Sequence, residues 1–318
     1  MADDEGGGGG RSDVLFIVFL IVGISAIWFL TGGPQKTDTK NLFLQPGTYS
    51  GTTATIGVPS VDLGVGGFDR EETDVVTQEV AEVRTELESL RTLPSSPYAG
   101  KVQIVSAWEA SQTLARNEYI TIRAKATNTE RIIITGFRLE SAISGKSAYI
   151  ASGSEIYQPG VGGGSAIFLD PGDEAIISTS RSPVGTSFRI NSCTGYLSQF
   201  QQFTPSLPSE CPAPEREAAG EDRAIYTDNS CMNYLQSMQI CTIDVNPPLP
   251  PTLSNTCRDF IQSRVTYKGC ISKHVTDSDF KKRQWRVYLG YDTELWRDKR
   301  EVIALIDAQG RLIDSTTY

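Results

Sequence analysis

An uninterrupted apolar stretch near the beginning of the chain constrains its structure more than any other feature. Residues 14–30 read VLFIVFLIVGISAIWFL and carry no charged side chain. This length approaches the roughly 20 apolar residues that a membrane-spanning helix needs, and the polar stripe of a buried globular helix is missing. We therefore expect the chain to cross a membrane once, from Val14 to Leu30, because no comparable stretch follows.

The flanks of this stretch favour an uncleaved signal anchor, residues 14–33, over a cleaved secretory signal. Residues 1–13 form an acidic, glycine-rich leader that we expect to be disordered, and no small-x-small cleavage site precedes the exit from the helix. Two signals for the orientation conflict. Basic residues follow the helix at Lys36 and Lys40, against Arg11 before it, which places the N-terminus outside. The cysteines place the C-terminal part outside the cytoplasm.

All six cysteines lie between Cys193 and Cys270. An even number of cysteines, confined to one segment of a membrane-anchored chain, predicts disulfides formed in an oxidising compartment. A zinc site is the alternative, but no C-x-x-C pair occurs and the only histidine, His274, follows the last cysteine. We therefore expect disulfides and no metal site.

The cysteine-rich segment, residues 192–283, contains a repeat of the form N-[ST]-C-x-x-[YF]-[LI] that begins at Asn191, Asn229 and Asn255. Asn, Ser and Thr are preferred at helix N-termini, so each copy should open a short helix with its cysteine in the first turn. One further cysteine follows each copy, which favours sequential pairing among the roughly 15 connectivities that six cysteines allow. The expected disulfides are then Cys193–Cys211, Cys231–Cys241 and Cys257–Cys270. The repeat also supplies three candidate binding aromatics, Tyr196, Tyr234 and Phe260.

Between the apolar stretch and the cysteines, two segments differ sharply in composition. Residues 34–68 are rich in Gly, Thr, Ser and Pro, which predicts a flexible stalk. Residues 69–93 are charged, with apolar residues spaced by four and three positions, which predicts an amphipathic helix that ends at Pro94. This helix either forms a short coiled coil between protomers or lies on the following domain. Its apolar stripe comprises Val76, Val80, Val83, Leu87 and Leu90.

Residues 101–191 and 284–318 have the pattern of short strands separated by turns. The segment EYITIRAKAT alternates strictly, with Ile120 and Ile122 on one face and Thr121 and Arg123 on the other, as in a half-buried strand. DPGD at residues 170–173 is a strong turn signal, and residues 301–318 read as a hairpin around AQG. An isolated hairpin is only marginally stable in water, so this terminal pair should complete the sheets begun at residue 101. We expect a mainly β sandwich that a cysteine-rich helical insertion interrupts.

The order of these segments resembles the lamin-tail domain, an immunoglobulin-like β-sandwich. The matching positions run from Glu118 to Ile122, from Ile134 to Leu139, from Leu169 to Gly172 and from Ile303 to Gly310. Two departures are Phe137, where the family often has Trp, and the cysteine-rich insertion before the last strands. The resemblance implies a binding or scaffolding module without catalytic residues, which bacterial relatives typically display at the cell surface or join to other domains.

The residues offer little support for catalysis or nucleic-acid binding. The formal net charge is −9, and the single basic cluster, Lys281 to Arg283, reads as a solvated turn before a strand. No G-x-S-x-G elbow accompanies His274, and the glycine-rich loops lack the Lys-Ser/Thr of a phosphate loop. No catalytic, cofactor or metal residues are expected.

We therefore expect a membrane-anchored, non-catalytic binding or adhesion module with an extracytoplasmic C-terminal domain, an unknown protein or glycan partner and possible self-association through the helix. An envelope hydrolase with a carboxylate-based site is the alternative. Inward-facing carboxylates gathered in one pocket would favour the enzyme, whereas exposed aromatic residues on a flat face would favour binding.

Overall fold

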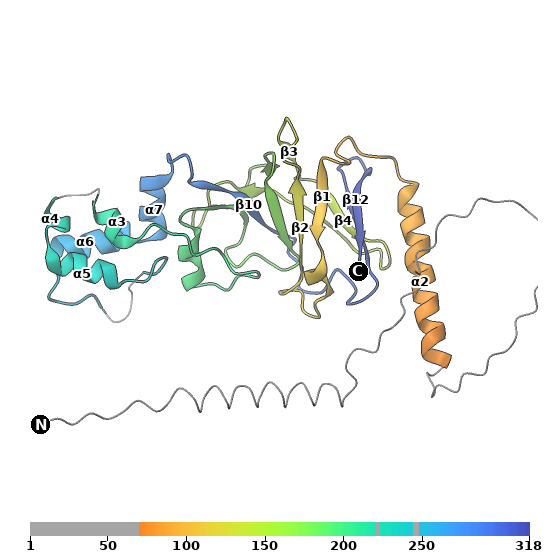
Figure 1. Ribbon diagram of the computed structural model, residues 1–318, viewed down its shortest axis with the longest axis horizontal. Helices are drawn as coiled ribbons and strands as arrows, with labels where there is room; N and C mark the ends of the chain where they lie inside the picture. The colour runs from red at the N-terminus through yellow and green to blue at the C-terminus, as the bar shows by residue number, and fades with distance from the viewer. Residues whose placement is uncertain (1–69, 220–222, 244–247) are drawn as a thin grey trace, which may run out of the picture. The chain divides into compact units, whose positions relative to one another are not determined.

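The computed structural model describes residues 70–219, 223–243 and 248–318. The expected leader, anchor and stalk lie outside these residues. Within the described ranges, no helix has both the length and the apolar character needed to span a membrane. The described part is mixed, with more strands than α-helices and several sheets (Figure 1).

Three sheets account for the strands. The six-stranded sheet has the order β1 (Val102–Ser106), β2 (Tyr119–Ala124), β8 (Glu174–Ser178), β10 (Lys281–Tyr288), β9 (Ser187–Asn191) and β6 (Gly153–Ser154). The four-stranded sheet has the order β12 (Leu312–Thr317), β11 (Val302–Ile306), β4 (Arg138–Ser141) and β5 (Ser147–Tyr149). A two-stranded sheet pairs β3 (Ile132–Ile133) with β7 (Phe168–Leu169). Most pairs are antiparallel, but β10 runs parallel to β8, and β6 runs parallel to β9.

The two larger sheets share one hydrophobic core. Strand β2 alternates as its sequence predicts, with Ile120, Ile122 and Ala124 buried. Trp285 in β10 and Leu305 in β11 belong to the same core, so apolar side chains from both sheets meet between them. This arrangement is a sandwich with a helical segment inserted between β9 and β10.

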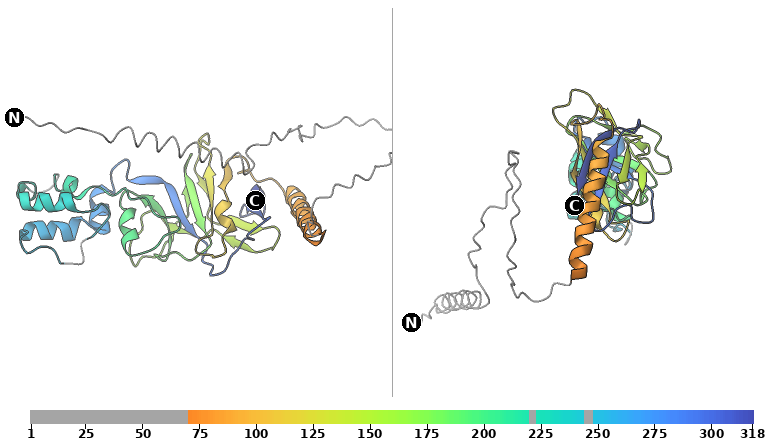
Figure 2. Two further views of the ribbon diagram at one scale, coloured as in Figure 1. Left: turned by 60° about the horizontal axis from the view of Figure 1, so that its bottom comes forward. Right: turned by 90° about the vertical axis from the view of Figure 1, so that its right-hand side faces the viewer.

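The inserted segment has a second core that extends onto the sheet. It contains η2 (Thr194–Gln199), α3 (Pro214–Ala219), α4 (Arg223–Tyr226), α5 (Asn229–Ser237), α6 (Asn255–Arg264) and α7 (Tyr267–His274). The helices gather at the end of the six-stranded sheet where β9 ends and β10 begins (Figures 1 and 2). Phe188 and Ile190 of β9 and Tyr288 of β10 join the buried residues of the helices in this core.

The helical segment contains three disulfides, as the cysteine count predicts, but the expected sequential pairing is wrong. The bonds join Cys193 to Cys270, Cys211 to Cys241 and Cys231 to Cys257. Two repeat cysteines pair with each other because α5 and α6 bring their first turns together, with a Cα–Cα distance of 5.7 Å. The caps lie one residue earlier than the repeat suggests, at Asp228 and Ser254, whose side chains accept hydrogen bonds from Cys231 N and Cys257 N.

Helix α2 (Arg70–Arg91) is the helix that the sequence predicts, and its C-terminal half lies on the following domain. The C-terminal half of its apolar stripe, Val83, Leu87 and Leu90, packs against β11 on the outer face of the four-stranded sheet. Arg297 donates to Glu82 at 3.2 Å across the same contact. Val76 and Val80 are exposed. The buried half of the stripe is therefore unavailable for a coiled coil with a second chain, whereas the N-terminal half remains uncovered by the described residues.

Candidate functional site

A mainly apolar hollow lies between the loop after β6 and helix α7. Its volume is about 460 Å³, within the range of small-molecule sites. The lining residues are Tyr157, Gln158, Pro159, Tyr267, Lys268, Ile271 and Ser272. The sandwich loop supplies the first three and α7 supplies the rest, so the hollow lies where the helical insertion contacts the sandwich.

Two buried tyrosines connect the walls of the hollow. The Tyr267 hydroxyl donates to the main-chain oxygen of Tyr157 at 2.9 Å, and the two rings lie 5.8 Å apart between centroids. Burial raises the pKa of Tyr267 above its usual value, so the phenol stays protonated and remains a donor. This bond ties the helical insertion to the sandwich loop at the hollow.

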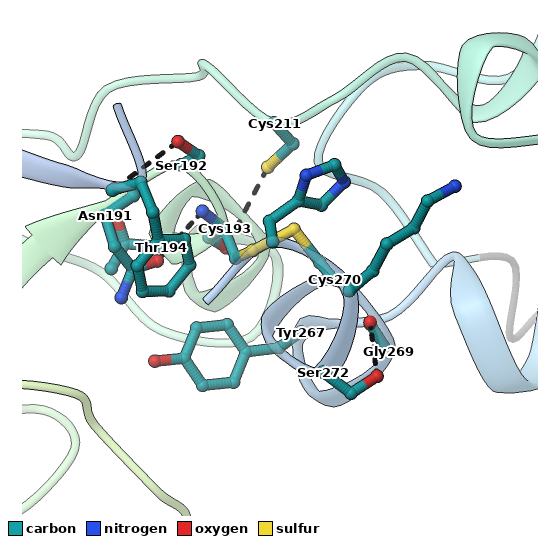
Figure 3. The surroundings of a disulfide bond; sticks show 12 residues. Asn191, Ser192, Cys193, Thr194, Cys211, Tyr267, Gly269, Cys270 and Ser272 are labelled. Atoms are coloured by element: carbon teal, nitrogen blue, oxygen red, sulfur yellow. Dashed lines mark hydrogen bonds between the residues drawn. A yellow bond between two sulfur atoms is a disulfide. The ribbon is translucent and has the colours of Figure 1, made fainter. Parts of the chain in front are cut away.

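Helix α7 is itself held in place at its first turn. The Thr266 side chain accepts from Gly269 N at 3.0 Å and caps the helix. Cys270 then forms the disulfide with Cys193, directly after β9 (Figure 3). The figure shows Tyr267 and Ser272 on the same helix beside this bond. The α7 wall of the hollow is therefore fixed to the end of the sheet by a covalent bond.

The polar groups of the hollow are few and carry a single formal charge. Lys268 is exposed and makes no ion pair with any described residue. The Ser272 hydroxyl donates to Gly269 O at 2.8 Å, which leaves its oxygen able to accept. Gln158 adds an exposed amide. The site thus combines apolar walls with one ammonium group and no carboxylate.

Buried carboxylates elsewhere in the sandwich are occupied in structural hydrogen bonds. Glu118 accepts from Leu295 N at 3.0 Å and Trp296 N at 3.1 Å, and burial raises its pKa although these bonds lower it in part. Glu301 binds the Ser141 hydroxyl and two backbone amides. Asp307 closes the turn of the last hairpin through Arg311 and Gln309 N. Glu118 and Glu301 thus both hold the segment 295–297, Asp307 holds its own turn, and all three are occupied in structural hydrogen bonds.

His274 lies between two carboxylates of the helical insertion. Its Nδ1 is 2.6 Å from Asp277 Oδ2 and its Nε2 is 2.9 Å from Glu217 Oε1. Burial lowers the pKa of His274, but the hydrogen bonds to Asp277 and Glu217 outweigh this and raise it. Lys273 Nζ also lies 3.3 Å from Glu217. The group links α7 to α3, and the ring has no nitrogen left to act on a substrate.

The candidate aromatics of the repeat do not form an exposed binding face. Tyr196 and Phe260 are buried in the second core, and Tyr234 is half-buried. This expectation is corrected because the third position after each repeat cysteine turns inward, where it fills the core between short helices. Trp108, in η1 (Trp108–Ser111), is instead 77% exposed beside a notch of about 200 Å³ between β1 and β12.

The sequence did not identify the hollow. Tyr157 lies in a segment that reads as a short strand, and Tyr267 and Lys268 lie outside the repeat. The one usable signal is Thr266, a helix-capping residue type before apolar positions. It marks the start of α7 but does not show that this helix lies opposite the loop after β6. No group of three or more His, Cys, Asp or Glu side chains that could hold a metal ion occurs in the described ranges.

Comparison with known proteins gives no further guide, because no protein-family model and no curated protein matches the sequence.

Proposed function

We propose that this protein is a membrane-anchored, non-catalytic binding or scaffolding module whose C-terminal domain lies outside the cytoplasm. The observation that carries the proposal is the set of three disulfides. All six cysteines are paired and buried. Such bonds form and persist in oxidising compartments. Together with the apolar segment Val14 to Leu30, they support a single-pass anchor that displays the domain at the cell envelope.

The distribution of carboxylates supports binding over hydrolysis. A hydrolase with a carboxylate-based site needs paired carboxyl groups that face a common cavity. Here Glu118 and Glu301 accept from backbone amides of residues 295–297, and Asp307 accepts from Arg311 in the last hairpin, so all three are committed to structural donors. The hollow at α7 contains no carboxylate. The arrangement therefore favours recognition, and we treat the envelope hydrolase as the weaker alternative.

The sandwich also supports the resemblance to the lamin-tail domain as a proposal. Three of the matching segments lie in or beside strands of the two facing sheets, at β2, β4 and the β11–β12 hairpin. The fold alone does not define a function, so the binding role rests on the resemblance and on the surfaces that the fold displays. In this chain, the helical insertion would supply the distinctive surface.

We further propose that the chain self-associates through the N-terminal half of α2. Val75, Val76 and Val80 are exposed there, while the continuation of the stripe packs against β11. A V76E/V80E variant should shift the full chain toward monomer in analytical ultracentrifugation. Thr85→Glu, at an exposed position of the same helix and with Val76 and Val80 unchanged, is the control. An unchanged sedimentation coefficient in both variants would remove the self-association proposal.

Thiol labelling in cells tests the proposed compartment. Cells that express the chain are treated with a membrane-impermeant bulky maleimide, before or after reduction, and intact cells are compared with permeabilised cells. A Lys125→Cys variant adds one exposed thiol on the sandwich as a control for access. We expect this added thiol to label in intact cells without reduction, and the six native cysteines to label only after reduction.

The opposite pattern would contradict the proposal. If the native cysteines and the thiol added by Lys125→Cys label without reduction, and only in permeabilised cells, the domain faces the cytoplasm with unpaired thiols. Both the envelope location and the argument from disulfides would then be wrong.

A further inference from the structure

The hollow between the sandwich loop and α7 has features that define a class of ligand. We propose that it binds a small amphipathic anion, an organic acid with a compact aromatic or branched aliphatic body. This inference rests on the binding role proposed above and names the ligand chemistry of one site. The shape, the charge and the rigidity of the hollow each contribute to it.

The walls favour an apolar body. The lining includes Tyr157, Pro159, Tyr267 and Ile271, and a volume of about 460 Å³ accommodates a ring with a short substituent. Burying apolar surface contributes roughly 25 cal/mol per Å² removed from water. A ligand without an apolar part would therefore leave the apolar walls in contact with water, and this term would contribute little to its binding free energy.

The charge favours an acid. Lys268 is the one charged residue in the lining, and among the described residues it has no carboxylate partner. An ammonium group beside a partly desolvated apolar wall attracts an anion more strongly than the same group in open water. The Gln158 amide can donate a further hydrogen bond. An amine would instead meet a like charge with nothing to neutralise it.

Where a cation lines another cavity of the described part, a carboxylate lies beside it. Arg116 lines a cavity of about 200 Å³ together with Asp292 and Glu294. Arg181 lines a larger cavity near β6 but binds Asp292 at 2.7 Å. Arg189 lines the cavity beside Trp285 and binds Asp173 at 2.7 Å. An acid would have to displace an existing partner at either place. Lys268 requires no such exchange.

The hollow is also held open by contacts that do not depend on a ligand. The Tyr267–Tyr157 hydrogen bond and the Cys193–Cys270 disulfide fix the two sides. A preformed site avoids much of the ordering cost that weakens binding to mobile surfaces. A small ligand can therefore bind here without a large apolar interface.

Photo-crosslinking on the purified full chain in detergent tests the inference and locates the site at the same time. The probe is 4-benzoylbenzoate, an aromatic acid that carries its own photoreactive group. Its charge-reversed partner is 4-(aminomethyl)benzophenone, which has the same apolar body. After irradiation, adducts are mapped by peptide mass spectrometry. We expect saturable adducts of the acid on residues 157–159 and 267–272, and few adducts of the amine there.

Two charge-reversal variants separate the role of Lys268 from a general effect of charge. Lys268→Glu should lower adduct formation at these peptides by about tenfold, which corresponds to about 1.4 kcal/mol of binding free energy. Lys125→Glu changes another exposed lysine, in the sandwich, that has no ion pair in the described part, and it should leave these adducts unchanged. Both lysines are on the surface, so both variants should fold.

Three results would overturn the inference: adducts spread evenly over the surface, equal labelling of the hollow by acid and amine, or no loss with Lys268→Glu. The outcome is independent of the compartment test. A cytoplasmic domain that still takes the acid in the hollow would refute the proposed location and keep the ligand class. An extracytoplasmic domain that gives no adducts of the acid in the hollow would refute the ligand class and keep the proposed location.

Discussion

Replacing Cys193 and Cys270 together by serine is the sharpest test of the structure of the helical insertion. The structure pairs these two residues, so the other four cysteines should remain bonded and a thiol assay on the denatured variant should find no thiol. Sequential pairing would instead leave Cys211 and Cys257 unpaired. The reciprocal control, Cys193→Ser with Cys211→Ser, should expose two thiols, at Cys241 and Cys270.

The length of the closed loop sets the expected loss of stability. Cys193 and Cys270 are 77 residues apart, and chain entropy for a loop of that length gives about 4.5 kcal/mol at 25 °C. The other two bridges cross each other and shorten the path between these cysteines to about 41 residues, which lowers the estimate to about 3.9 kcal/mol. We therefore expect the free energy of unfolding to fall by about 4 kcal/mol.

Urea unfolding of the full chain, followed by near-ultraviolet circular dichroism, measures this loss. The same samples can be digested with trypsin without reduction. The sequence places Cys193 and Cys211 on residues 190–216, three cysteines on residues 224–258, and Cys270 on residues 269–273. The wild-type bridges should hold all three peptides together. A peptide 190–216 that migrates alone, or a loss below about 1 kcal/mol in the variant, would refute the reasoning.

Three other substitutions probe contacts of single residues. Glu118→Ala leaves the amides of Leu295 and Trp296 without their buried acceptor, so urea unfolding should show a loss of about 2–4 kcal/mol. The raised pKa of His274 means that its stabilising contribution is complete below the unfolded-state pKa of about 6.5 and is lost as the pH rises through the folded-state pKa. The urea midpoint of the wild type should therefore fall as the pH rises from about 6.5 through the folded-state pKa. This fall should be absent in His274→Gln. NMR of the single imidazole measures the pKa directly. Gly195→Ala places a methyl group against the Cys211–Cys241 disulfide and should cost about 1–3 kcal/mol, whereas Gly164→Ala, in open space, should be nearly neutral by the same thermal-melt assay.

Features that depend on a few neighbouring residues could be predicted from the sequence. The alternation of EYITIRA matches strand β2, in which every second residue is buried. The terminal hairpin was identified by its AQG turn, and β11 and β12 pair on either side of it. The presence of disulfides followed from cysteine number, because an even set in one segment needs no knowledge of the fold.

Features that depend on packing between distant segments could not be predicted. The pairing of Cys231 with Cys257 requires two helices to place their first turns side by side, which the repeat itself does not encode. The inward turn of Tyr196 and Phe260 has the same origin, since a short helix can bury a side chain only by packing against other elements. Tyr157 and Tyr267 meet across 110 residues of sequence, so neither one marks the hollow by itself.

The sequence boundary of the insertion differs from its physical boundary, and this difference explains why the hollow lies where it does. Asn191 and Lys281 are paired across β9 and β10, so the insertion begins and ends as the loop of a hairpin would. Its core nevertheless includes Phe188 and Tyr288 from the same strands. Without the insertion these apolar side chains would be exposed to water, which is unfavourable. The insertion must therefore pack on the sandwich, and the disulfide at Cys193 fixes α7 at that contact. The contact between the insertion and the sandwich is thus fixed by packing and by a disulfide, and the hollow at its edge has rigid walls. Rigid walls are what a preformed binding site requires.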